Sequence, residues 1–417
     1  MTKVGAGGTA PAGALSHIRV LDLSRILAGP WASQMLADFG ADVIKIERPG
    51  SGDDTRSWGP PYLKDSEGKA TDIAAYYLSC NRNKRSVTID FTQPAGQQLV
   101  RELAKQSDVV LENFKLDGLK QYGLDYESLR AINPRLVYCS ITGFGQDGPY
   151  AARAGYDFLI QGMGGLMSLT GRPDGEPGGG PMKVGVALTD ILTGLYASNA
   201  ILAALTYRER SGEGQYIDLA LLDVQVACLA NQAMNYLTTG NSPTRLGNAH
   251  PNIVPYQDFP TADGYMILAI GNDGQFSRFC AIAGQAELAS DERYTTNKAR
   301  VQHRETLIPQ LCAITATRTT AEWVAALEAA AVPCGPINTL AQVFDDPQVK
   351  VRGVKVSMSH TTAGSVELVG NPIRMSASPV TYRRAPPGLG QHTREVLGDV
   401  LGVSAENLAQ LSSDTVI

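Results

Sequence analysis

From residue 18 onward, short apolar segments alternate with segments of helical periodicity. This alternation constrains the fold class more than any other feature of the sequence. The first pair is IRVLDLS, an expected strand at 18–24, and GPWASQMLADFG, an expected helix at 29–40. A second helix is expected at PAGQQLVRELAKQS (94–107), and further strands at ADVIKIER (41–48), KRSVTIDF (84–91), DVVLENF (108–114) and RLVYCSITGFG (135–145). Strands separated by single helices predict an α/β fold with a doubly wound, Rossmann-like parallel sheet. Ligands then bind where the carboxyl ends of the strands open into loops.

The length of 417 residues exceeds that of one ordinary core and predicts two domains. We expect a long helix after the charged turn at residue 208, within RERSGEGQYIDLALLDVQVACLANQAMNYL. The expected division is a flexible tail at 1–16, a large domain at 17–225 completed by 340–417, a linker and active-site loop at 226–254, and a small α/β domain at 255–339.

Composition excludes several classes of protein and partner. With 43% hydrophobic and 18% charged residues the chain is globular rather than disordered or fibrous, and a net charge of −5 does not predict a nucleic-acid or membrane partner. The apolar stretch 184–205 carries Asp, Thr, Ser and Asn, which is typical of a core helix and not of a membrane span. Six scattered cysteines and a first segment without an apolar run favour the cytoplasm, and five separated histidines predict no metal site.

Polar loops follow the expected strands. Glu47 and Arg48 lie about where a dinucleotide fold places a ribose-binding acid, but the GxGxxG fingerprint is missing, and an arginine suits a phosphate better; a surface salt bridge is the alternative. SCNRNKRS (79–86) is either a solvated basic turn or a site for an adenosine phosphate. ENFKLDGLKQYG (112–123) either anchors a base or is an ordinary cap with a core Phe, and TGFGQDGPY (142–150) offers amides to an anion. Together the loops favour a phosphate-bearing nucleotide.

Asp190 stands inside the apolar stretch VGVALTDILTGLYASNAILAAL. A carboxylate there needs compensation, and two interpretations remain open on the residues alone. It is either the N-cap of a helix beginning at Ile191 or a nucleophile held at the start of that helix. Both interpretations imply a lowered pKa and an ionised side chain.

Several stretches together resemble the family III CoA-transferases, the group of formyl-CoA transferase and carnitine CoA-transferase. The resemblance runs from about residue 17 to the end, through VLDLSRILAGPWASQMLADFGADVIKIERPGSGDDTR, NRNKRSVTIDF, VLENF, GPYAARAGYDFLIQGMGGLMSLTG, GVALTDILTGLYASNAILAAL and GLGQHTREVL. The succinyl-CoA:glutarate (dicarboxylate) CoA-transferases are the most similar members, through RAGYDF, QVACLANQAMNYL, GNAHPNIVPYQDF and GPINT.

The resemblance implies an interlocked homodimer, with Asp190 aligned with the catalytic aspartate of the family. Formyl-CoA transferase carries Gln in place of Leu27 and Lys in place of Thr142, so side-chain contacts at those two positions differ. In place of the family's Gly-rich closing loop stands LGNAHPN (246–252). The positions that match its CoA-binding residues are Leu27, Ala28, Arg48, Cys80, Asn81, Arg82, Asn83, Asn113, Phe114, Lys115 and Thr142.

The implied reaction moves CoA from an acyl-CoA, expected to be succinyl-CoA, to a dicarboxylic acid such as glutarate or itaconate. An aspartate carries the acyl group as an anhydride and CoA as a thioester, so coenzyme A is the only cofactor expected and no metal is needed. Candidates for substrate contacts, including the distal carboxylate, are Arg25, Tyr156, Arg245 and His250.

Other functions remain as alternatives. α-Methylacyl-CoA racemases share the resemblance but use a His where this chain has Tyr156, and a phenol is a poor base for an α-proton. Transfer to formate or another monocarboxylate is a second alternative. A CoA-binding regulator without activity is a third.

Overall fold

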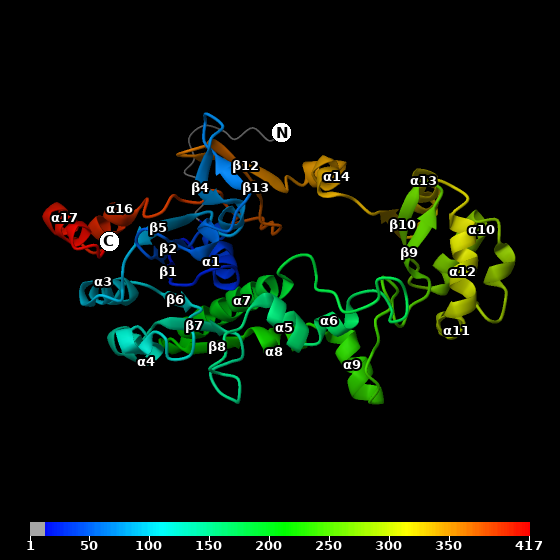
Figure 1. The fold of residues 1–417 in the computed structure, drawn as a ribbon, viewed down its shortest axis with the longest axis horizontal. Helices are drawn as coiled ribbons and strands as arrows, with labels where there is room; N and C mark the ends of the chain where they lie inside the picture. The colour runs from blue at the N-terminus through cyan, green and yellow to red at the C-terminus, as the bar shows by residue number, and fades with distance from the viewer. Residues whose placement is uncertain (1–12) are drawn as a thin grey trace. The chain divides into compact units, whose positions relative to one another are not determined.

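The computed structural model describes residues 13–417, which form two compact units (Figure 1). The first unit comprises residues 13–165, Val184–Ala233 and Lys350–Ile417, and the second comprises Leu166–Lys183 and Met234–Val349. The tail predicted for residues 1–16 falls mostly outside the described residues. The observed boundaries lie eight to ten residues beyond the predicted ones at 225 and 339, and the grouping of 166–183 with the second unit was not foreseen.

A six-stranded sheet forms the centre of the first unit, and all of its pairings are parallel, as predicted. The spatial order is β5-β2-β1-β6-β7-β8, so the chain reverses its direction of winding between β1 and β6. The strands are β1 (Arg19–Asp22), β2 (Asp42–Glu47), β5 (Lys84–Thr88), β6 (Val109–Glu112), β7 (Val137–Thr142) and β8 (Tyr216–Ala220).

The edge strand β8 corrects the sequence interpretation, which placed these residues in one long helix. Ile217 and Leu219 pack against the core while Asp218 is exposed, which is the alternation of a strand. The helical part that follows is broken into α8 (Leu221–Ala227) and α9 (Ala230–Thr239). Apolar residues run on from β8 into α8 without a turn former, and this continuity hid the boundary.

Helices cover both faces of the sheet (Figure 1). On one face α1 (Ala28–Asp38), α5 (Asp157–Met163) and α7 (Leu188–Ser211) bury apolar residues such as Leu36, Ile160 and Ile201. α3 (Pro94–Lys105), α4 (Tyr126–Ile132), α16 (Thr393–Asp399) and α17 (Ala405–Ser413) pack on the other. α7 is long and apolar enough to cross a membrane by composition, yet its inner face is part of this core.

Smaller elements complete the first unit. The hairpin β12 (Lys355–His360) and β13 (Gly364–Val369) shares an apolar cluster with residues of β4 and α2. The connecting elements are η1 (Asp54–Arg56), β3 (Tyr62–Lys64), β4 (Ala70–Ala74), α2 (Ala75–Leu78) and η2 (Lys120–Tyr122).

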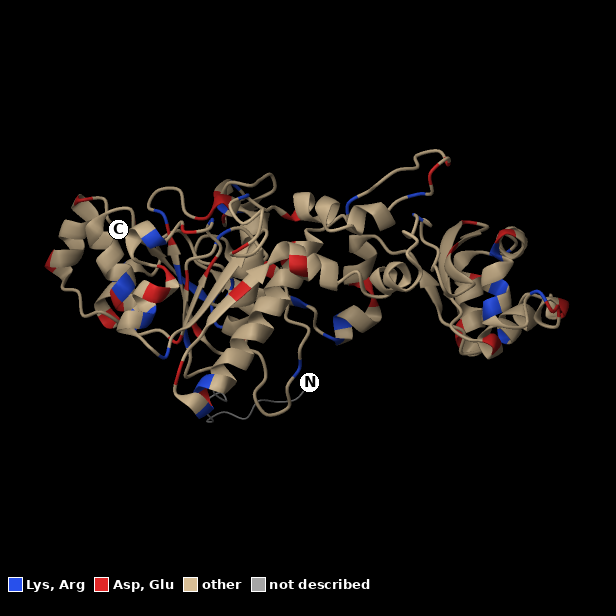
Figure 2. Ribbon diagram, turned by 90° about the horizontal axis from the view of Figure 1, so that it is seen from below, with Lys and Arg blue, Asp and Glu red and all other residues tan. Residues whose placement is uncertain are grey.

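The second unit has a core of its own around the fully buried Trp323. Its three-stranded sheet is antiparallel in the order β11-β10-β9, from Cys334–Pro336, Gly264–Ala269 and Tyr256–Thr261. Its helices are α6 (Leu166–Leu169), α10 (Asp273–Ile282), η3 (Ala286–Ala289), α11 (Asn297–Gln302), α12 (Arg304–Thr315), α13 (Thr320–Ala329) and α14 (Leu340–Asp345), with α15 (Pro347–Val351) at its end. Basic and acidic residues are interspersed over both units (Figure 2).

Candidate active site

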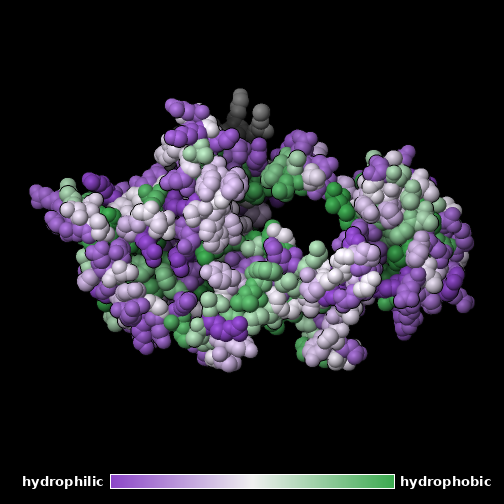
Figure 3. Space-filling view, in the orientation of Figure 1, coloured by the Kyte–Doolittle hydropathy of each residue, from purple (hydrophilic) through white to green (hydrophobic). Residues whose placement is uncertain are grey.

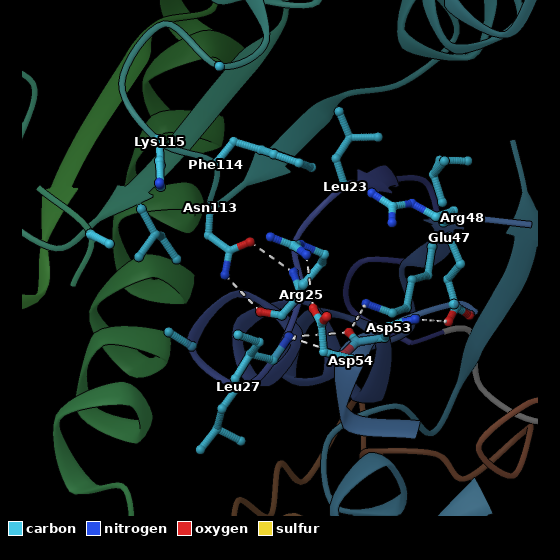
Figure 4. Close-up of a pocket in the computed structure, with 18 of the residues that line it drawn as sticks. Leu23, Arg25, Leu27, Glu47, Arg48, Asp53, Asp54, Asn113, Phe114 and Lys115 are labelled. Atoms are coloured by element: carbon cyan, nitrogen blue, oxygen red, sulfur yellow. Dashed lines mark hydrogen bonds and ion pairs between the residues drawn. The ribbon is translucent and has the colours of Figure 1, made fainter. Parts of the chain in front are cut away.

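A cavity of about 830 Å³ opens at the carboxyl ends of β1, β2, β6 and β7 in the first unit. The loops after β1 and β6, between which the winding reverses, form two of its walls (Figure 4). The start of α7 contributes Asp190. The predicted site residues that line this one cavity are Arg25, Leu27, Ala28, Arg48, Asn113, Phe114, Lys115, Thr142, Tyr156 and Asp190.

The segment 79–86 does not line the cavity, and its side chains are used inside the fold. Arg82 pairs with Asp38 at 2.5 Å and donates to the Val369 carbonyl at 2.8 Å. The predicted residues Cys80, Asn81, Arg82 and Asn83 are all buried. The interpretation as a solvated turn is therefore wrong. The contact of these residues with CoA remains a prediction that rests on the family resemblance.

Two further predicted residues, Arg245 and His250, belong to the second unit. Arg245 pairs with Asp174, and the ring of His250 lies 5.3 Å from that of Tyr256. Their contact with substrate also remains a prediction.

Asn113 locks the loop after β6 to the loop after β1. Its amide oxygen accepts from the Arg25 N–H at 2.8 Å and its Nδ2 donates to the Arg25 carbonyl at 2.7 Å (Figure 4). Arg25 also pairs with Asp54 at 2.9 Å and lies over the Phe114 ring, 5.4 Å from its centroid. The side chain of Asn113 therefore fixes the cavity wall, a role that neither sequence interpretation of this loop contained.

The loop after β1 turns sharply at Ile26, which has a φ of +73° in the left-handed region. A β-branched residue adopts this conformation only when its surroundings impose it. The Asp53 carboxylate accepts from the Ile26 N–H at 3.2–3.3 Å, and Lys45 pairs with Asp53 at 2.9 Å. The turn places Leu27 and Ala28, at the start of α1, on the cavity wall.

Glu47 and Arg48 are neighbours in sequence but differ in burial and pairing. Glu47 is buried in an ion pair with Arg56 at 2.7 Å and accepts from Ser86 at 2.6 Å, so it is not free to hold a ribose. Arg48 is exposed on the cavity wall and forms no ion pair within residues 13–417. This arrangement agrees with the sequence argument against a dinucleotide fold.

Two amides of the turn after β7 have acceptors within the fold. The Gly145 N–H donates to Thr142 Oγ1 at 2.9 Å, and the Gln146 N–H donates to Asp218 at 3.1 Å. These two amides are satisfied, and the binding of an anion by the turn remains a prediction.

Asp190 is not the N-cap of its helix. α7 begins at Leu188, which places Asp190 in the first turn, and the N-cap Ala187 has no capping side chain. The cap comes from Asp157, whose Oδ1 accepts from the N–H groups of Thr189 at 2.8 Å and Asp190 at 3.3 Å. Sequence reasoning missed Asp157, although it lies in the RAGYDF stretch that carries the resemblance.

The carboxyl of Asp190 has no hydrogen-bond donor and no cation within the described chain, and 9% of the residue is exposed. Burial, with a smaller contribution from the charge of Asp157, raises its pKa to about 7. The predicted lowering is therefore wrong, because the helix cap is supplied by a second carboxylate. Residues 13–417 contain no cluster of three or more His, Cys, Asp or Glu side chains that could hold a metal.

The model of CoA-transferase family III matches residues 15–393. The chain belongs to this family. It is 56% identical to a succinate–glutarate CoA-transferase of Agrobacterium fabrum, over 93% of this chain and 95% of that one. It is 45% identical to a succinyl-CoA:glutarate CoA-transferase of Mus musculus, over 97% of this chain and 90% of that one.

Solved structures agree with this assignment. A CaiB/BaiF family protein from Brucella suis is 53% identical and superposes with a TM-score of 0.82, covering 93% of this chain and 100% of that one. As a family III CoA-transferase the chain is an enzyme with CoA thioesters as substrates. The cavity, which is lined by seven of the eleven predicted CoA-binding residues and by Asp190, is its candidate active site.

Proposed function

We propose that the enzyme transfers CoA from succinyl-CoA to a dicarboxylic acid, with glutarate as the first candidate and itaconate as a second. The names of the two relatives support the substrates. The observation that carries the proposal is a desolvated carboxyl, that of Asp190, facing the cavity with no cation to neutralise it. Such a group is unfavourable for folding and suited to nucleophilic attack.

Asp190 would carry first the acyl group and then CoA. Its carboxylate attacks the thioester carbonyl, a C–O bond forms, the C–S bond breaks, and CoA thiolate leaves a mixed anhydride. The thiolate then attacks the Asp190 carbonyl and releases succinate, which leaves an aspartyl-CoA thioester. The acceptor carboxylate repeats these steps in reverse order. Each step replaces one anion by another, so no proton has to move and no general base is required.

The surroundings of Asp190 suit this role. A carboxylate with a pKa of about 7 is a stronger nucleophile than one at 3.8, yet at pH 8 roughly 90% of it is ionised. Leu27 and Ala28, at the start of α1, line the same cavity, and their N–H groups can donate to the oxyanions that form on the thioester and on Asp190. The turn at Ile26 holds these donors in place before substrate arrives.

CoA would extend along the loops after β2 and β6. Arg48 and Lys115 are exposed on this part of the wall and form no ion pair within residues 13–417, so they are available to phosphates. The ring of Phe114 offers an apolar surface for the base.

The assembly is proposed to be a homodimer whose chains interlock. Hydrophobic side chains are exposed on the first unit, among them Phe158 of α5 and Tyr196 and Tyr207 of α7, on a largely hydrophilic surface (Figure 3). A family fold that buries them against a second copy accounts for their exposure in one chain. Light scattering should give twice the chain mass of 44.4 kDa. A monomer that is fully active would contradict the interlocked arrangement.

Mass spectrometry tests the proposed chemistry. After incubation with succinyl-CoA and rapid quenching, the peptide containing Asp190 should carry a CoA or succinyl adduct. Asp190→Asn should carry none, and should transfer CoA at least about 10⁴-fold more slowly while remaining folded. An unmodified Asp190 peptide in an enzyme that turns over, or an active Asp190→Asn variant, would remove the residue from the mechanism.

A further inference from the structure

Six basic side chains line the cavity, and three of them form no ion pair with a described residue. Arg25, Lys45 and Arg56 are each paired with a carboxylate of the same wall region. Arg48, Lys115 and Arg153 line the cavity without an ion pair to any described residue. Arg48 and Lys115 follow β2 and β6, whereas Arg153 follows β7 and precedes the segment that leads to Asp190.

Arg153 is held on the cavity wall by stacking and by the backbone. Its guanidinium lies 4.7 Å from the ring centroid of Tyr150 and 5.2 Å from that of Phe144. Its own N–H donates to the Tyr150 carbonyl at 2.8 Å, which closes a turn. One guanidinium nitrogen, Nη2, donates to Met163 Sδ at 3.8 Å, and the other N–H groups have no partner among the described residues and are available to a planar oxyanion.

The segment that carries Arg153 is fixed next to the end of β7. Gly143 and Gly155 approach so closely that a Cβ built on Gly143 would lie 2.5 Å from the Gly155 Cα, and no side chain fits at either position. Four residues after Arg153, Asp157 caps the helix turn that contains Asp190. Four residues span at most about 14 Å, so Arg153 lies close along the chain to the residue that caps the Asp190 turn.

No hydrogen bond or ion pair joins Arg153 to Asp190, so the arginine does not neutralise the nucleophile. Both residues line the same cavity, where a substrate with a second carboxylate would lie between them. The carboxyl carbons of succinate and glutarate lie roughly 4–5 Å apart, as standard bond lengths require. One end then meets Asp190 during acyl transfer while the other accepts hydrogen bonds from the guanidinium.

We propose that Arg153 binds the distal carboxylate of the dicarboxylate substrates and sets the preference for dicarboxylic over monocarboxylic acids. This assignment rests on the proposed CoA transfer to dicarboxylates. Because succinyl-CoA and the acceptor occupy the same position in turn, one arginine serves both halves of the reaction.

Arg153→Met tests the assignment with two acceptors of equal length, glutarate and its monoamide glutaramate. KM for glutarate and for succinyl-CoA should rise about 10- to 100-fold, since a charged hydrogen-bonding partner is lost, while kcat changes by less than about 3-fold. KM for glutaramate should change little, so the preference for the dicarboxylate disappears. Arg153→Lys, which keeps the charge but not the planar fork, should give an intermediate preference and serves if Arg153→Met fails to fold.

Arg130→Met is the matched control, because Arg130 also lies over a tyrosine, 5.9 Å from the Tyr126 centroid, but does not line the cavity. It should leave both acceptors unchanged. A wild type that uses glutarate together with an unchanged KM in Arg153→Met, or an equal loss with both acceptors, would overturn the arginine assignment alone. A wild type that transfers CoA to no dicarboxylate would overturn the proposed function and the assignment with it.

Discussion

Asp53 and Asp190 are both carboxylates removed from water, yet their pKa values move in opposite directions. Burial opposes the ionisation of Asp53, but Lys45 and the donors of Thr55 outweigh it and lower its pKa to about 2. Burial and the neighbouring Asp157 raise the pKa of Asp190 to about 7. The compensated carboxylate stabilises a strained loop, whereas the uncompensated one keeps its reactivity for substrate.

The compensated region is a network of charges under the loop after β1. Lys45 donates to the Ser24 carbonyl at 2.7 Å as well as to Asp53, and Lys84 pairs with Asp22 at 3.2 Å. All four charged side chains are fully buried. Because each charge depends on the others, loss of one leaves its partner buried and unpaired.

Removing Lys45 should therefore give the largest effect on stability. Lys45→Met leaves Asp53 without its cation, and the free energy of unfolding should fall by about 3–5 kcal/mol. Urea denaturation measures the difference. Lys120→Met, which removes an exposed lysine 3.8 Å from Asp117, is the control and should cause no measurable change. A fall below about 1 kcal/mol for Lys45→Met would show that the network is not what fixes this loop.

Asp190→Asn should do the reverse and stabilise the protein at neutral and higher pH. The folded-state pKa of about 7 exceeds the ordinary value of 3.8, so between these values the folded wild type binds more protons than the unfolded chain. The free energy of unfolding of the wild type therefore falls as pH rises from about 4 to about 7. That of Asp190→Asn does not fall for this reason, because Asn has no carboxyl to ionise. We expect a gain of up to about 4 kcal/mol at pH 8 that vanishes towards pH 4.

Urea denaturation of wild type and Asp190→Asn at pH 4.5, 6 and 8 measures this difference. The gain should grow with pH while transfer activity is absent at every pH. A variant less stable than wild type at pH 8 would mean that the Asp190 carboxylate is compensated after all, and the contrast with Asp53 would disappear.

The parallel sheet and the place of the cavity could be predicted because both follow from short-range signals. Strand and helix periods alternate cleanly over residues 18–145, and the polar residues at strand ends, such as Arg48 and Asn113, converge once those strands are parallel. β8 escaped because YIDLA joins a helix without a turn former. The strand alternation of Ile217, Asp218 and Leu219 is too short to stand out from the apolar helix that follows it.

The partners of individual side chains could not be predicted, since they come from distant parts of the chain. Arg82 meets Asp38 and a carbonyl at Val369, so a basic run that suggests solvent or phosphate is buried. One of the two interpretations made Asp190 the cap of its own helix, but the cap is Asp157, separated from it by more than thirty residues. These contacts decide the sign of the pKa shift at the nucleophile, and spacing along the sequence carries no information about them.

Asp157→Asn tests the contrast between Asp53 and Asp190. It removes the negative charge next to Asp190 but keeps an oxygen that can cap α7. Its amide oxygen can still accept from the Thr189 and Asp190 N–H groups. In wild type kcat/KM should rise with pH, with an apparent pKa near 7 as Asp190 ionises. In the variant the apparent pKa of this rise should be lower than in wild type. It should stay above the ordinary aspartate value, because burial, the larger cause of the raised pKa, remains.

A pH–rate profile between pH 5.5 and 9 reports the shift, and Asp157→Ala provides the comparison. Alanine removes charge and cap together, so it should show the same shift plus a loss of about 1 kcal/mol in stability. An acid limb that stays at the same pH in both variants would leave burial alone as the cause of the raised pKa.

Glu112 gives the smallest and most selective test, because it matches Asp190 in pKa but not in position. Burial raises its pKa to about 7, and its Oε2 accepts from the Phe114 N–H at 2.7 Å, away from the large cavity. Glu112→Gln keeps an acceptor for that amide, so kcat and KM for acyl-CoA should stay within about 2-fold of wild type. Glu112→Leu leaves the amide unsatisfied and should raise KM several-fold without lowering kcat, because Phe114 lies on the CoA side of the cavity. If Glu112→Gln abolished transfer as Asp190→Asn should, a raised pKa in a buried carboxyl would no longer single out the nucleophile.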